Sequence, residues 1–135
     1  MKKCIWLLII MLVTLFSLSS CGSSSSSPGG STPTTHSVYF AMYNNSGGNQ
    51  VGVSYTIHAA GANSNSFTEV QPNSEWVSSI YSIQSDYSVD FSGVCNNENQ
   101  SGTLIAHIMV DGNAWKSVTI NSTYHATFDI QGTLP

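Results

Sequence analysis

Apolar and polar residues alternate along most of the chain between residue 36 and residue 135. The alternation is clearest in 50–59, where apolar and small polar side chains fall on opposite sides of an extended backbone. Similar runs occupy 37–43, 66–70, 75–83, 86–94, 103–120 and 123–131, with Asn, Gly, Asp and Pro between them. Residues 111–113, Asp-Gly-Asn, are typical of a tight β-hairpin turn. Outside the amino-terminal segment no stretch carries the 3.6-residue apolar spacing of an amphipathic helix.

These runs predict an all-β domain of seven or eight short antiparallel strands. So many half-apolar strands in about 100 residues favour a two-sheet antiparallel β-sandwich, which is immunoglobulin-like in architecture only. A small closed barrel is the alternative. The sandwich is favoured because the runs differ in length and 66–70 resembles an edge strand. By their phase we expect Tyr87, Phe91, Cys95 and Phe128 to point into the core.

The amino-terminal segment has the pattern of a lipoprotein signal. Lys2 and Lys3 precede an apolar run that ends at Phe16 and is shorter than the roughly 20 residues of a spanning helix. The following "LSSC" resembles the bacterial lipobox. The resemblance implies that Cys21 becomes the new amino terminus and carries several acyl chains, which together anchor a protein stably. Gly22, in place of the aspartate that retains many lipoproteins, implies the outer membrane of a Gram-negative host, or otherwise the extracytoplasmic face of the cell membrane.

The chain therefore divides into three predicted parts. Residues 1–20 form the signal peptide, 21–35 form a lipidated cysteine with a flexible Ser/Gly/Pro/Thr tether, and 36–135 form the β-sandwich domain. A chain of this composition has a root-mean-square reach of about 20 Å. The tether would therefore hold the domain close to a bilayer.

The net charge of the chain argues against some classes of binding partner. Charged residues make up 7% of the sequence, and removal of 1–20 leaves one lysine against seven acidic residues, a formal net charge of −6. Such a surface repels phosphate backbones and argues against a nucleic-acid partner. It also lacks the basic clusters that bind anionic lipid headgroups, so the predicted membrane contact is the lipid anchor alone.

The domain resembles the extracytoplasmic part of the mycobacterial membrane protein small (MmpS) family. The stretches that carry the resemblance are "VGVSYTI", "VQPNSEW" and "IMVDGNAWKSVTINSTYHATFDIQGTL". The resemblance implies an extracytoplasmic β-sandwich and a role beside an export permease. Members of that family are typically anchored by a transmembrane helix, whereas a lipobox and a tether stand in its place here.

No catalytic or metal-binding motif is present in the sequence. His36, His58, His107 and His125 lack zinc-type spacing, although His107 and His125 would approach each other if their strands were neighbours. Cys95 has no expected partner once Cys21 is acylated, so it is either buried or pairs between chains. The aspartates and glutamates fall in turns or on outward positions, and Asp111 is expected to shape its turn. We therefore predict no enzymatic activity, no metal and no cofactor.

Aromatic side chains are the remaining candidates for a binding surface. The alternation cannot place all of them inside, and the candidate binding residues are Tyr39, Tyr43, Trp76 and Trp115. Aromatic residues on a sheet can bind sugars or proteins. The favoured hypothesis is a lipid-anchored envelope binding module, accessory to an export or assembly complex. The alternative is a carbohydrate-binding or adhesin-like module.

Overall fold

The structure is a computed structural model that describes residues 32–96, 102–121 and 124–135. The segment Pro33–Pro135 forms one compact unit. The predicted signal peptide, the lipidation site at Cys21 and most of the tether lie outside the described residues.

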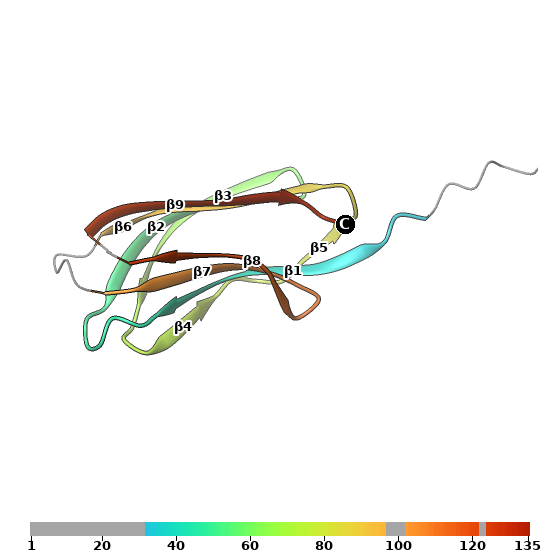
Figure 1. Cartoon of the computed structure of the whole chain (residues 1–135). Helices are drawn as coiled ribbons and strands as arrows, with labels where there is room; N and C mark the ends of the chain where they lie inside the picture. The colour runs from blue at the N-terminus through green and yellow to red at the C-terminus, as the bar shows by residue number, and fades with distance from the viewer. Residues whose placement is uncertain (1–31, 97–101, 122–123) are drawn as a thin grey trace, which may run out of the picture. The chain divides into compact units, whose positions relative to one another are not determined.

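Nine β-strands make up the described chain (Figure 1). They are β1 (Thr35–Asn44), β2 (Val51–Ala59), β3 (Ala62–Val70), β4 (Ser74–Val77), β5 (Tyr81–Gln84), β6 (Ser88–Asn96), β7 (Leu104–Val110), β8 (Asn113–Ile120) and β9 (Tyr124–Thr133). The alternation from which these strands were predicted follows from strand geometry, because successive side chains of a strand point to opposite faces of its sheet.

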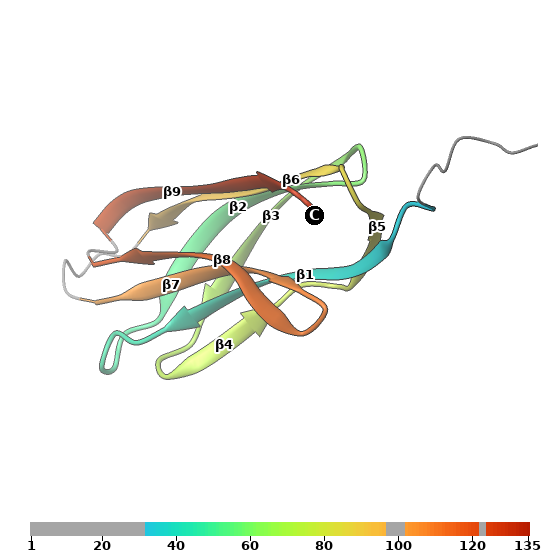
Figure 2. The ribbon, with the colours of Figure 1, turned by 45° about the vertical axis from the view of Figure 1, so that its right-hand side comes forward.

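The strands form two antiparallel sheets that pack face to face. The five-stranded sheet has the order β4-β1-β7-β8, and β5 also pairs with β1. The four-stranded sheet has the order β3-β2-β6-β9. Both sheets contribute buried residues to one core, and two views show them as separate layers (Figures 1 and 2). The predicted β-sandwich is therefore confirmed, and the closed-barrel alternative is wrong.

The turn between β7 and β8 follows the sequence prediction. Asp111 and Gly112 have φ values of 50° and 80°, the positive pair that a two-residue hairpin turn needs. The Asp111 carboxylate also ties this turn to β1, since its Oδ1 accepts a hydrogen bond from the Ser37 backbone N–H at 2.8 Å.

The run 75–83 was expected to be one strand, and this prediction is wrong. It is split into β4 and β5, which pair with opposite halves of β1. The Ser78 hydroxyl accepts the Phe40 N–H at 3.0 Å, and the Ser78 N–H donates to the Phe40 carbonyl at 2.9 Å. These bonds hold β1 to the break between β4 and β5. The split also raises the strand count above the predicted seven or eight.

The core is centred on Phe91, which is fully buried. Its ring lies 5.2 Å from the rings of both Phe40 and Phe128, measured between centroids. Phe128 and Cys95 are buried, as their phase predicted. Tyr87 is 51% exposed, so the prediction that it points inward is wrong. The reason is that β6 begins only at Ser88, and the positive φ of Asp86 turns the chain just before it.

Cys95 is expected to be unreactive in the folded protein. Burial raises the pKa of its thiol to about 11, and the thiolate is the nucleophile in thiol chemistry. We expect a disulfide reagent at neutral pH to leave Cys95 unlabelled in the native full chain and to label it fully in urea. A Cys95→Ser variant identifies the signal. Rapid labelling of native protein would contradict the burial.

Asn44 is the buried polar side chain in this core, and sequence analysis did not single it out. Its amide nitrogen donates to the carbonyls of Asn49 and Val70, at 2.8 Å each. Its amide oxygen accepts the Ser46 N–H at 3.0 Å. One side chain therefore joins the end of β1, the loop that follows it and the end of β3.

Candidate functional site

Trp76 belongs to the interior rather than to an open surface. It pairs with the fully buried Met42 in the β1–β4 register, so both side chains lie on the inner face of the five-stranded sheet. The Trp76 ring lies 4.7 Å from that of Tyr55 and 6.3 Å from that of Phe91, centroid to centroid. Half-buried Trp76 therefore closes the β4 side of the sandwich.

Trp115 lies on β8, at the opposite edge of the five-stranded sheet from β4 and Trp76. The β7–β8 register shifts between Ile108 and Met109, which leaves Trp115 as the extra residue of a bulge. A Cβ added at Gly132 of β9 would lie 2.6 Å from the Trp115 ring, so this ring packs directly over the Gly132 backbone. The bulge allows the Trp115 side chain to pack against the core.

Tyr39 and Tyr43 lie on the outer face of the five-stranded sheet. They alternate with buried residues of β1 and stand opposite Met109 and Ile105 of β7. All four side chains are half-buried. The four candidate binding residues of the sequence therefore occupy three separate places: Trp76 on one side of the sandwich, Trp115 on the other, and Tyr39 with Tyr43 on an outer face.

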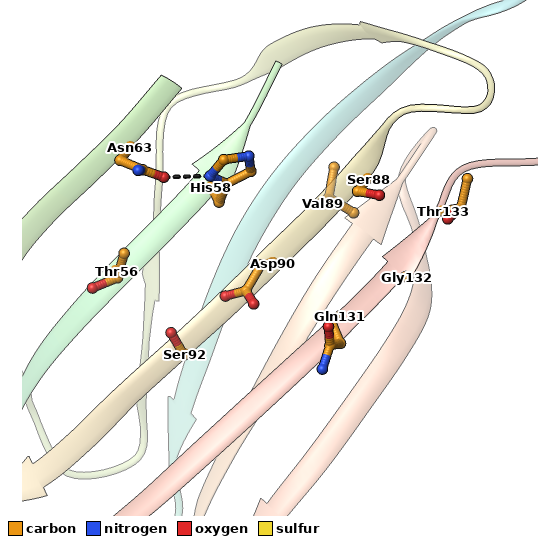
Figure 3. A pocket seen from close by; sticks show the side chains of 10 residues that line it. All are labelled: Thr56, His58, Asn63, Ser88, Val89, Asp90, Ser92, Gln131, Gly132 and Thr133. Carbon is orange, nitrogen blue, oxygen red and sulfur yellow. Dashed lines mark hydrogen bonds between the residues drawn. The ribbon is translucent and has the colours of Figure 1, made fainter. Parts of the chain in front are cut away.

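A different surface, on the outer face of the four-stranded sheet, gathers polar side chains. It is a shallow groove of about 510 Å³, here called the polar groove (Figure 3). Four adjacent strands supply its polar side chains, which are Thr56 and His58 of β2, Asn63 of β3, Ser88, Asp90 and Ser92 of β6, and Gln131 and Thr133 of β9. Val89 and Gly132 complete the lining. The groove is the candidate binding site of the described domain.

Strand register arranges these side chains in rows across the sheet. One row runs Asn63, His58, Asp90, Gln131 from β3 to β9. A row across four strands spans roughly 14 Å at the usual spacing between strands. Within the row the His58 imidazole donates to the Asn63 side-chain oxygen, which fixes its orientation (Figure 3). Thr56 is held likewise, because its hydroxyl donates to the Asn65 side chain at 2.7 Å.

The backbone of the two central strands is already paired at the groove. β2 pairs with β3 and β6, and β6 pairs with β2 and β9. Ladder hydrogen bonds therefore use the N–H and C=O groups on both sides of β2 and β6. A ligand in the middle of the groove meets side chains, and these are hydroxyls, amides, one imidazole and the Asp90 carboxylate.

The alternation in the sequence predicted which side chains of a strand face outward, but it did not predict which strands are neighbours. It placed His58 of β2 and Asp90 of β6 on outward positions of their strands. It did not show that β2 and β6 are neighbours or that Gln131 of β9 completes the row. Sheet order depends on contacts between residues far apart in sequence, and a single sequence does not contain it.

A second polar cluster lies where the chain enters the domain. His36 Nδ1 donates to Asp111 Oδ2 at 2.7 Å, and His36 Nε2 lies 3.2 Å from the Pro135 carbonyl oxygen. The Ser85 hydroxyl lies 3.3 Å from His36 Nε2 and donates to the Thr34 carbonyl at 3.2 Å. This His36 cluster ties the start of β1, the β7–β8 turn and the end of the chain together.

The His36 cluster contains a serine, a histidine and an aspartate in hydrogen-bond order. Nucleophilic catalysis needs His36 Nε2 as a base that takes the serine proton. Here the Pro135 carbonyl occupies Nε2 as an acceptor, and the Ser85 hydroxyl directs its proton to the Thr34 carbonyl. The arrangement is that of a protonated imidazole holding three segments, rather than that of an activated serine.

The His36 cluster is expected to make stability depend on pH. The hydrogen bond to Asp111 is the main cause that raises the pKa of His36 above 6.5, and the same bond is the main cause that lowers the pKa of Asp111 below 3.8. The contribution of His36 to the free energy of unfolding is complete below pH 6.5 and is lost as pH rises through its raised pKa. The contribution of Asp111 is complete above pH 3.8 and is lost as pH falls through its lowered pKa.

We therefore expect the urea midpoint of the full chain to fall as pH rises from 6.5 through the raised pKa of His36, and to fall less in His36→Gln. His107→Gln is the matched control, because the His107 ring bonds to Ser117 on an outer face, at 2.7 Å. An NMR titration of His36 should give a pKa above 6.5. Equal pH dependence in the wild type and in His36→Gln would contradict the role of the cluster.

The other predicted site residues do not converge. His107 lies on β7 and His125 on β9, in different sheets. In the described ranges, no three residues among His, Cys, Asp and Glu come together as a metal site would require. Across the same ranges, no helix has the length and apolar character to cross a membrane.

Comparisons with protein-family models, with curated proteins and with solved structures find no match to this chain.

Proposed function

We propose that the chain is a lipid-anchored binding module of the bacterial envelope, and that its partner binds in the polar groove. The lipobox-like "LSSC" and the Ser/Gly/Pro/Thr tether support the anchoring. The observation that carries the binding role is the gathering of eight polar side chains from four strands on one outer face. The proposed role has no chemical step and needs no cofactor.

The partner is a component of the envelope, either a protein or a glycan. An accessory role beside an export or assembly complex, which the resemblance to the MmpS family implies, stays a prediction. The groove favours the glycan, because hydroxyls and amides dominate its lining and the central strands β2 and β6 offer no free backbone edge to a protein strand.

The anchor is tested by Cys21→Ser in the full chain expressed in a bacterium. We expect wild type to incorporate an alkyne-tagged fatty acid and to sediment with membranes, and we expect Cys21→Ser to lose the label completely. Cys4→Ser is the matched control, since Cys4 lies in the segment predicted to be removed. Label that persists in Cys21→Ser would overturn the anchor.

The binding role is tested with the purified lipidated chain and envelope fragments from the expressing host. We expect retention on the fragments to fall at least tenfold in the double variant Asp90→Asn, Gln131→Ala. The control is Asp129→Asn, which changes the same charge on the same outer face but outside the groove. Retention that both variants leave unchanged would overturn the groove as the binding site.

A further inference from the structure

We propose that the polar groove binds an uncharged oligosaccharide, with Tyr87 as the ring on which one sugar stacks. This inference rests on the proposed function, because it names the ligand class for the same groove. Four properties of the groove support it: the hydrogen-bonding side chains in the lining, the hydrogen bonds that these side chains already make, the charge of the lining, and the exposed aromatic residue beside the groove.

The groups that the groove offers match a ligand that is dense in hydroxyls. Side-chain hydroxyls and amides both donate and accept hydrogen bonds, and the Asp90 carboxylate offers two acceptor oxygens. An apolar ligand would cover these groups without pairing them, which is costly. Small-ligand pockets are usually lined mainly by apolar residues, and this groove is not. A polyhydroxylated ligand is the class that pairs with such a lining.

The hydrogen bonds that the lining side chains already make also favour a polyhydroxylated ligand. His58 and Thr56 are already fixed by side chains of β3, so they present oriented atoms to a ligand. In the described part of the chain, no hydrogen bond or ion pair engages the Asp90 carboxylate, which lies between His58 and Gln131 in its row. A half-buried carboxylate with free acceptors, flanked by an imidazole and an amide, is suited to accept two adjacent sugar hydroxyls.

The charge of the groove selects against anionic glycans. Asp90 is the ionisable acid in the lining, and among the described residues no lysine or arginine side chain lines the groove. The chain after residue 20 has one lysine against seven acidic residues. Like charges repel across an interface and suppress the wrong partners. Uronic acids, sialic acids and phosphorylated sugars are therefore disfavoured relative to neutral hexoses.

Tyr87 is an exposed aromatic residue next to the groove in sequence, and it lines a neighbouring cavity rather than the groove itself. It precedes Ser88 of the lining and is 51% exposed, and its neighbouring cavity of about 340 Å³ is also lined by Ala60, which lies two residues after His58, and by 82–84 of β5. One face of a hexose ring is made of C–H groups, which pack against an aromatic ring while the hydroxyls bond elsewhere. The exposed Tyr87 ring is therefore the surface on which we expect a sugar to stack where the oligosaccharide extends beyond the groove.

The test is binding of the full chain in detergent to immobilised oligosaccharides. The probes are neutral gluco- and manno-oligosaccharides, with oligomers of uronic acids as the anionic comparison. We expect binding to at least one neutral series and at least tenfold weaker binding to the anionic one. Asp90→Asn and Tyr87→Ala should each weaken the neutral binding at least tenfold.

Matched controls separate the groove from general surface effects. Asp129→Asn removes an equal charge outside the groove, and Tyr124→Ala removes a tyrosine of similar exposure, 47% against 51%. Both should bind like wild type, and all variants should keep the wild-type urea midpoint. Absence of neutral binding, or equal loss in variants and controls, overturns the inference. If groove variants still lose envelope retention in that case, the proposed function stands and only the ligand class fails.

Discussion

Replacement of Phe91 by alanine is expected to lower the free energy of unfolding by about 3–5 kcal/mol. Phe91 is fully buried and lies at the centre of the aromatic cluster that joins the two sheets. Its removal deletes buried apolar surface and leaves a cavity between the sheets, and rings that are held by both sheets cannot collapse freely into it. Urea unfolding of the full chain, followed by circular dichroism, measures the change.

Phe67→Ala is the matched control for this substitution. Phe67 is 56% exposed on β3, where its ring lies against the backbone of Gly52. We expect it to cost less than about 1 kcal/mol, because surface substitutions have small effects. A result in which the two alanine variants are equally stable would contradict the placement of Phe91 at the centre of the core.

Asn44→Ala is expected to destabilise the fold by about 2–4 kcal/mol although it removes few atoms. A buried polar group without a partner costs about 1–3 kcal/mol. The substitution leaves the Val70 carbonyl without its Asn44 partner at a buried position, and it also removes the bonds to Asn49 and Ser46. Because these bonds join β1 to the end of β3, we expect faster amide exchange in the 45–50 loop.

Asn45→Ala supplies the comparison for Asn44. Asn45 is the exposed neighbour, and the hydrogen bond at this position is made by its backbone N–H to the Thr103 carbonyl, at 2.8 Å. An alanine keeps that bond, so we expect a change below about 0.5 kcal/mol. Equal unfolding midpoints for the two alanine variants would show that the side chain of Asn44 does not hold the loop.

The sequence predicted the features of the fold that depend on local geometry. Alternation placed Phe128 and Cys95 in the core, and the Asp111-Gly112 pair marked the hairpin turn. Where alternation failed, a local irregularity had intervened. The positive φ of Asp86 turns the chain just before Tyr87, which is exposed, and the bulge in β8 lets Trp115, a candidate for an open binding surface, pack against the core.

The candidate site was less accessible to sequence reasoning. Exposed aromatics were the expected signal, yet Trp76 is half-buried against Tyr55 and closes one side of the sandwich. Most of the polar groove consists of Ser, Thr, Asn and Gln, residue types that are abundant throughout this sequence. Only the β2–β6 and β6–β9 registers show which of them lie in one row.

Trp76 and Trp115 lie on opposite sides of the sandwich, so the fluorescence of each tryptophan reports on one side. Trp6 lies in the segment predicted to be removed, so a processed chain would fluoresce from Trp76 and Trp115. Trp76 emits from beside Tyr55, whereas the Trp115 ring has the Lys116 ammonium 5.1 Å from its centroid. Single-tryptophan variants would therefore follow the β4 side and the β8–β9 side separately during unfolding. Coincident transitions would identify the sandwich as one cooperative unit.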